Sequence, residues 1–218
     1  MAKKVTLYVD IVSPFAYIAY HITRTSPVFK DIELTYIPIF LAGIMQQAGN
    51  TPPFKIKNKD TWINVERQRW TKLFNVPSIG MPSPFPQSTV TAQRALCYIE
   101  SVHPKKLVAS IDALYAAFWG QGKPIGKNET VIEALSGVLG EQEAKNIVEV
   151  EIKKDETKKK MNANTQLAWE AGAFGLPWFV ATNEKGEKEG FWGVDHLGQM
   201  LNFLEVKRVQ EGGWKAML

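Results

Sequence analysis

A strand that runs into a helix through a Ser-Pro step lies near the start of the chain and limits the folds open to it. Residues 4–10 are rich in β-branched and aromatic side chains and alternate in character, a pattern typical of a strand. Ser13 and Pro14 follow; serine is a favoured N-cap, and proline is favoured at the first helical position. The sequence therefore predicts a strand over 4–10 and a helix over 14–26.

Ser13 is the first candidate functional residue because it lies at this junction. Free backbone N–H groups and the positive end of the helix dipole meet there and favour an anion, each contribution being worth roughly 0.3–1 kcal/mol. Two interpretations fit: Ser13 only caps the helix, or its hydroxyl and the helix end hold a thiolate. The local sequence leaves both open.

A second strand is predicted over 33–40, which gives a strand, a helix and a parallel strand in the first part of the chain. Residues 41–59 contain Gly, Asn and Pro in a pattern typical of an ordered loop. Residues 76–87 hold four prolines and predict a stiff, irregular connection.

The middle of the chain has only helical patterns. Asp60, Ser88 and Asn128 are predicted N-caps. The predicted helices cover residues 60–75, 88–102, 104–120, 128–138, 140–151 and 154–172.

Strand patterns return after this helical part. Residues 178–182 and 188–192 predict a hairpin around a turn that ends in glycine, and a last helix is predicted over 196–207. The order of elements is that of an α/β, thioredoxin-like fold with an all-helical domain inserted after the N-terminal βαβ unit. We assign residues 1–42 and 173–218 to the thioredoxin-like domain and residues 43–172 to the inserted domain.

Composition excludes several functional classes. The net charge of the 218 residues is +4, and no basic stripe predicts a nucleic-acid partner. No apolar run is long enough to span a membrane, and the first residues lead into a strand without the pattern of a secretory signal. The three histidines are far apart without ligand spacing, so no metal site is expected.

Cysteine usage argues against redox chemistry. A redox-active thioredoxin fold needs Cys-x-x-Cys at the start of the first helix, but those positions here run from Ser13 to Ala16. Cys97 is the only cysteine and is predicted to be a buried apolar residue, in a protein of a reducing compartment such as the cytoplasm. Any reactive thiol must therefore come from a ligand.

The Leu176-Pro177 step lies where thioredoxin folds place a proline that faces the start of the first helix. If the bond is cis, the backbone groups of Leu176 are free to pair with an extended peptide; a trans proline that simply begins a strand is the alternative. Together with Ser13, this step predicts a site for a thiol peptide.

With these features in place, the whole chain resembles kappa-class glutathione transferases, a family that also resembles bacterial 2-hydroxychromene-2-carboxylate isomerases. The resemblance covers nearly the whole chain and is specific in the order and spacing of its pieces. These are DIVSPFAY at 10–17, AGIMQQAGNTPP at 42–53, Lys59 and Glu66, GAFGLPWFV at 172–180 and FWGVDHL at 191–197.

The resemblance implies that glutathione is bound as a substrate. Ser13 matches the catalytic serine that hydrogen-bonds the glutathione sulfur, and Pro14 and Phe15 belong to the same sulfur-side segment. Asn50 matches an asparagine that contacts glutathione. Lys59 matches a lysine near the glycyl carboxylate.

The resemblance also implies four residues elsewhere in the site. Leu176, before Pro177, matches the backbone partner of the cysteinyl residue, and Asp195 matches the group that takes the γ-glutamyl ammonium. Val194 stands where the family often has serine, so we expect weakened binding through its backbone N–H alone. Glu66 stands where some relatives have aspartate. In addition, Trp178 is expected to shape the pocket of the second substrate.

Three functional hypotheses follow. The first is a kappa-class transferase that conjugates the glutathione thiolate to small electrophiles in detoxification. The second is a glutathione-dependent isomerase that acts on an unsaturated substrate, and the third is a non-catalytic thioredoxin-fold binding module. The resemblance further implies a homodimer, and a peroxisomal or mitochondrial location as alternatives to the cytoplasm.

Overall fold

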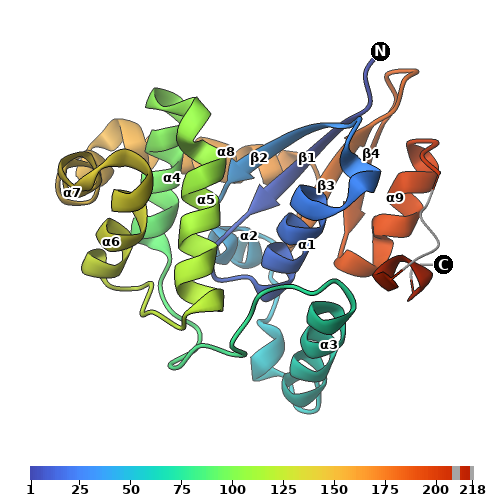
Figure 1. Cartoon of the computed structure of the whole chain (residues 1–218), viewed down its shortest axis with the longest axis horizontal. Coiled ribbons are helices and arrows are strands. Elements are labelled where there is room, and N and C mark those ends of the chain that lie inside the picture. Colours follow the sequence, from blue (N-terminus) through green and yellow to red (C-terminus); the bar gives the residue numbers. More distant parts are fainter. Residues whose placement is uncertain (208–211, 217–218) are drawn as a thin grey trace.

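A mixed four-stranded sheet forms the centre of the protein (Figure 1). The computed structural model describes residues 1–207 and 212–216. The order of strands in the sheet is β2-β1-β3-β4, which confirms the predicted α/β, thioredoxin-like arrangement. The strands are β1 (Lys4–Val9), β2 (Glu33–Pro38), β3 (Trp178–Thr182) and β4 (Lys188–Trp192).

The two halves of the sheet come from opposite ends of the chain. β1 pairs in parallel with β2, so that Lys4 lies opposite Glu33. β3 pairs antiparallel with β1, with Tyr8 opposite Trp178, and then forms the predicted hairpin with β4. This register brings the carboxyl end of β1 beside the start of β3, where the Leu176-Pro177 step lies.

Helices cover both faces of the sheet. α1 (Pro14–Thr25) and α9 (Leu197–Phe203) lie on one face, and α2 (Leu41–Gln47) and α8 (Asp155–Glu170) lie behind the other (Figure 1). The strand alternation decides which side chain goes where: Leu7 packs in the larger core with α1 and α9, and Tyr8 in a smaller core with α2 and α8.

The remaining helices lie to one side and below the sheet. α4 to α7 gather beside the sheet, whereas α3 lies below α1 (Figure 1). The larger core continues from the sheet into these helices without a break, and the division into a thioredoxin-like and an inserted domain stays a prediction. The helices are α3 (Lys59–Leu73), α4 (Val90–Val102), α5 (Leu107–Tyr115), α6 (Asn128–Leu139) and α7 (Glu141–Glu149).

The prediction of a loop over 41–59 is wrong in part, because this stretch contains α2 and a 3-10 turn at Pro53–Lys55. The cause is a distant cap: the Asp10 Oδ2 atom accepts a hydrogen bond from the Leu41 N–H at 2.9 Å. Ile44 then buries its side chain in the smaller core. The composition of this stretch does not predict α2, because the first turn of the helix is stabilised by Asp10, the residue that follows β1.

The three predicted N-caps are also wrong. Asp60 lies inside the first turn of α3, Asn128 is the first residue of α6, and Ser88 precedes the actual N-cap, Thr89. Thr89 does not use its hydroxyl for capping, because Oγ1 donates to the Asp10 Oδ1 atom at 2.7 Å. The Thr89 hydroxyl therefore serves a buried carboxylate and does not cap the helix.

Two helices are shorter than predicted. The stretch 104–120 divides into a 3-10 turn, α5 and a π-helical turn at Ala116–Gly120, where the Trp119 indole N–H donates to the Ile11 carbonyl at 2.9 Å. The last helix ends at Phe203, because Glu205 has a φ of 54° and the Val206 N–H returns to the Leu201 carbonyl at 2.9 Å.

Two sequence features can be placed on this fold. Cys97 is buried, as predicted, and burial raises the pKa of its thiol to about 12. Within residues 1–207 and 212–216, no helix combines the length and the apolar character needed to cross a lipid bilayer.

Candidate functional site

A cavity of about 1280 Å³ opens where the start of α1 meets α2, α3 and the loop before β3. A further wall comes from residues 74–89, which join α3 to α4 and are called the connector below. Six of the predicted site residues line the cavity: Ser13, Pro14, Phe15, Asn50, Lys59 and Leu176.

Ser13 lies at the inner end of this cavity with its hydroxyl hydrogen available. It is the N-cap of α1, and its Oγ atom accepts a hydrogen bond from the Ala16 N–H at 3.1 Å. Its O–H donates to no group in the described part of the chain. Pro14 has no N–H, and the Phe15 N–H in the same first turn has no hydrogen-bond partner among the described residues. The arrangement suits an anion that accepts from the Ser13 hydroxyl and the helix end.

Asp10, at the end of β1, holds the segments around Ser13 together. Its side chain is completely buried and accepts hydrogen bonds from the Val12 N–H at 3.1 Å, the Leu41 N–H and the Thr89 hydroxyl. Its backbone carbonyl accepts from the Ser13 N–H at 3.0 Å. Burial nevertheless raises the pKa of the Asp10 carboxyl, against the lowering effect of these donors.

The loop before β3 forms the opposite wall. The Leu176-Pro177 bond is cis, and Leu176 lines the cavity. Its N–H and C=O make no hydrogen bond within residues 1–207 and 212–216. Pro177 is buried beneath it and does not line the cavity; its carbonyl accepts from the Gly193 N–H at 3.1 Å. The Leu176 backbone therefore has free groups for an extended ligand.

Asn50 and Lys59 lie on the outer rim. The Asn50 Nδ2 atom donates to the Phe174 carbonyl at 3.1 Å and so connects the α2–α3 loop to the loop before β3. Lys59, the first residue of α3, is exposed, and its ammonium has no ion-pair partner among the residues that the structure describes. A ligand carboxylate can reach this ammonium without breaking an existing contact.

Glu66, Val194 and Asp195 do not line the cavity. Glu66 instead forms an ion pair with Arg69 at 3.1 Å. Val194 is buried, whereas the Asp195 side chain is largely exposed, 3.4 Å from the His196 Nδ1 atom. The roles assigned to these residues by resemblance stay predictions.

Trp178 was expected to shape the pocket of the second substrate, but it does not line the cavity. It is buried below the sheet edge against Gly172 and Gly190, where a Cβ atom would lie 3.2 and 2.6 Å from its ring. The aromatic side chains that do line the cavity here are Trp192 and Phe174, whose ring centroids are 5.0 Å apart.

Arg67 is the clearest site residue that sequence reasoning missed. It lines the cavity from α3 and is only 3% exposed. Asp60, Ile63 and Asn64 line the same cavity at helical spacing before it. The helical spacing of these four residues is the signal in the sequence that could have found the site face of α3.

The described part of the chain contains no group of three or more His, Cys, Asp or Glu side chains that could hold a metal ion.

Comparison with known proteins adds three likenesses over nearly the whole chain. The family model of the DSBA-like thioredoxin domain matches residues 4–205. Glutathione S-transferase kappa 1 of Caenorhabditis elegans is 24% identical over 93% of this chain and 91% of its own length. The 2-hydroxychromene-2-carboxylate isomerase of Pseudomonas putida is 26% identical over 88% of this chain and 90% of its own length.

A solved structure shares the fold. The structure of a 2-hydroxychromene-2-carboxylate isomerase superposes with a TM-score of 0.75, at 23% identity, and covers 93% of this chain and 94% of the other. A likeness at this level of identity establishes the fold alone.

Proposed function

Because this chain belongs to the family of DSBA-like thioredoxin domains and lacks that fold's cysteine pair, we propose that it is a kappa-class glutathione transferase. One observation carries the proposal: the Ser13 oxygen is already used as a helix cap, which leaves its O–H to donate into a large cavity. The likeness to named kappa-class transferases over more than nine tenths of the chain supports the same reaction.

The Ser13 hydroxyl and the α1 N-terminus stabilise the glutathione thiolate, which is the reactive form. The thiol proton passes to solvent, because the first turn of α1 carries no basic side chain. The sulfur then forms a bond to an electrophilic carbon, and the leaving group departs with the electron pair of the broken bond. The enzyme needs no redox partner for this step.

The tripeptide extends from Ser13 along the loop before β3. Its cysteinyl backbone pairs with the free N–H and C=O of Leu176, and its glycyl carboxylate pairs with the Lys59 ammonium. Asn50, which joins the α2–α3 loop to the loop before β3, contacts the tripeptide between these two points. Asp195 receives the γ-glutamyl ammonium, helped by the exposure of its carboxylate.

A titration with glutathione tests the proposal. The ultraviolet absorbance of the thiolate is followed against pH for the wild type and for the Ser13→Ala variant. We expect the pKa of the bound thiol to fall well below that of free glutathione in the wild type only. An unshifted bound thiol in the wild type would contradict the proposal.

An isomerase that uses glutathione as a cofactor is the second candidate, favoured by the likeness to the Pseudomonas putida isomerase. In that reaction the thiolate adds to an unsaturated carbonyl compound and later leaves, so glutathione is regenerated. Consumption of one glutathione per product formed separates the transferase from the isomerase.

Assembly and location are further parts of this proposal. The resemblance to kappa-class transferases suggests a homodimer, which light scattering after size exclusion would measure. The single buried cysteine suits a reducing compartment such as the cytoplasm. A chain that binds no glutathione at millimolar concentration would instead be a binding module.

A further inference from the structure

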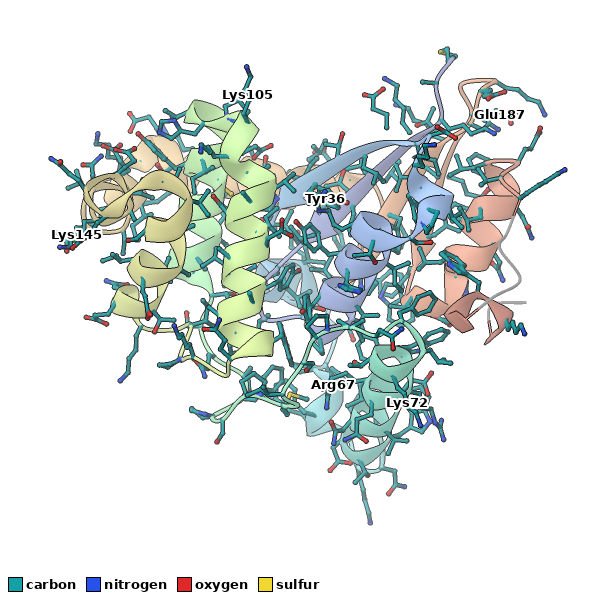
Figure 2. The ribbon with its side chains drawn as sticks, in the orientation of Figure 1. Tyr36, Arg67, Lys72, Lys105, Lys145 and Glu187 are labelled. Carbon is teal, nitrogen blue, oxygen red and sulfur yellow. The ribbon has the colours of Figure 1, made fainter. Side chains whose placement is uncertain are left out.

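Arg67 is a buried cation at the wall of the cavity that the chemistry of glutathione does not use. Its side chain leaves α3 on the face shared by Asp60, Ile63 and Asn64, all of which line the cavity. Figure 2 shows Arg67 on the side of α3 that turns toward the connector and Lys72 on the side turned away. Only 3% of Arg67 is exposed, so its guanidinium is held almost entirely within the protein.

The guanidinium has a neutral partner only. Its Nε and Nη2 atoms donate to the Asn64 Oδ1 atom at 3.3 and 3.0 Å, and Nη1 donates to no group in residues 1–207 and 212–216. No described carboxylate lies within ion-pair distance. Burial lowers the pKa of Arg67, with no nearby anion acting in the other direction, yet an arginine stays charged near neutral pH.

A buried charge without a counter-ion is unusual, because desolvation disfavours it unless a partner compensates. Here the partner can come from a ligand, since the side chain borders open space. Arginine presents a planar fork of donors that matches a carboxylate with two parallel hydrogen bonds.

Other walls of the same cavity suit an apolar body attached to that anion. Phe85 of the connector and Phe54 lie edge to face with centroids 6.1 Å apart, and Met81 lines the same cavity. An aromatic or unsaturated ring can lie on these side chains while its carboxylate reaches α3.

The glycyl carboxylate of glutathione is a poor candidate for this partner. Lys59, which we assign to that group, precedes Arg67 by eight residues, so their Cα atoms are about 12 Å apart along α3. Lys59 is exposed at the rim, whereas Arg67 is deep. The two cations therefore serve two different anions.

We propose that Arg67 binds a carboxylate on the second substrate, so that this enzyme prefers small electrophiles that carry an acid group. The inference rests on the proposed transferase function and assigns the specificity of the same cavity.

The test uses two electrophiles with the same ring and leaving group, one charged and one neutral: 4-chloro-3-nitrobenzoate and its methyl ester. Glutathione sulfur bonds to the ring carbon and chloride leaves, and each enzymatic rate is divided by the uncatalysed rate. We expect the wild type to prefer the acid and Arg67→Gln to lose about ten- to hundredfold in kcat/KM for the acid, with the ester unchanged. Arg67→Lys should fall between them, because it keeps the charge without the fork.

Lys72→Gln is the matched control, since it removes one positive charge from an exposed position of the same helix outside the cavity. It should leave both rates unchanged. Glutathione titration and thermal unfolding are measured for every variant, and we expect neither to change in Arg67→Lys. If Arg67→Gln does not fold, the ratio of acid to ester rates in Arg67→Lys decides.

Three results would overturn the inference: a wild type without preference for the acid, equal losses for acid and ester in the Arg67 variants, or weakened glutathione binding in those variants. A binding measurement without glutathione separates this failure from failure of the proposed function. Quenching of tryptophan fluorescence by 3-nitrobenzoate, with Trp62 in the cavity wall, should require Arg67 even if no thiol is activated.

Discussion

Replacing Ser13 tests both tasks of one side chain. The Oγ atom caps α1 through the Ala16 N–H at 3.1 Å, and in the proposed mechanism the O–H donates to the glutathione sulfur. In Ser13→Ala, loss of the cap should lower the free energy of unfolding by about 1 kcal/mol. Loss of a hydrogen bond to a charged sulfur should cost a further ~1.5–3 kcal/mol of thiolate stabilisation.

The second quantity converts into a pKa. One pKa unit corresponds to about 1.4 kcal/mol, so the bound thiol of Ser13→Ala should titrate about 1–2 units higher than in the wild type. Turnover at neutral pH should fall by up to about a hundredfold and recover as the pH rises. The assay is the pH profile of the conjugation rate, alongside the ultraviolet titration of the bound thiol.

Ser13→Gly separates the two tasks, because glycine at an N-cap costs only about a few tenths of a kcal/mol. Its stability should stay near that of the wild type, while its pH profile should match that of Ser13→Ala. Ser13→Thr, which keeps a hydroxyl, should restore most of the shift. A wild-type thiol pKa in Ser13→Gly would refute the reasoning and leave Ser13 as a helix cap alone.

Three further predictions concern buried groups. Burial raises the pKa of Asp10 in the folded protein above its unfolded value of about 4, so the native state binds more protons between the two values. This contribution to stability is lost as the pH rises through that window. Urea unfolding between pH 4 and 8 should therefore show a smaller fall in the free energy of unfolding for Asp10→Asn than for the wild type. Thr89→Val removes a buried donor to Asp10 and should lower the free energy of unfolding by about 1–3 kcal/mol, against less than about 0.5 kcal/mol for Thr91→Val, a half-buried residue whose hydroxyl makes a solvent-exposed hydrogen bond to Asn128. Cys97, whose pKa is raised to about 12 by burial, should react with a colorimetric disulfide reagent only in denaturant, and reaction at native rates similar to those of a free thiol would contradict its burial.

The elements that were predicted correctly are those whose support is local. β1 and α1 follow from the alternation of residues 4–10 and from Ser13-Pro14, since a strand pattern and a cap act over a few residues. α2 could not be found in this way, because the carboxylate at its start comes from Asp10, 31 residues earlier. Asp10 also accepts from the hydroxyl of Thr89, the N-cap of α4, 79 residues away, whereas the local pattern predicted Ser88 as that cap.

The residues of the candidate site differ in the same way: some could be predicted from their neighbours in sequence, and others depend on distant packing. Ser13 could be named from its own neighbourhood, and Leu176 from the place of its proline in the order of strands. Arg67 could not, because its burial depends on how α3 packs against the rest of the protein, and nothing in the composition of α3 fixes that packing. Trp178 and Trp192 are direct partners in the hairpin, and both pack against Phe174, yet only Trp192 lines the cavity; the strand pattern alone does not separate them.

The two ends of the cavity therefore have separate origins. The sulfur end is built by β1, α1 and the loop before β3, which the thioredoxin-like arrangement supplies in any case. The other end is built by α3 and the connector, neither of which belongs to the sheet. A chain without its own cysteines needs both: the first lowers the pKa of a borrowed thiol, and the second positions the carbon that it attacks. Substitutions at Arg67 should therefore change which electrophile reacts without changing the pKa of the thiol, and substitutions at Ser13 should do the reverse.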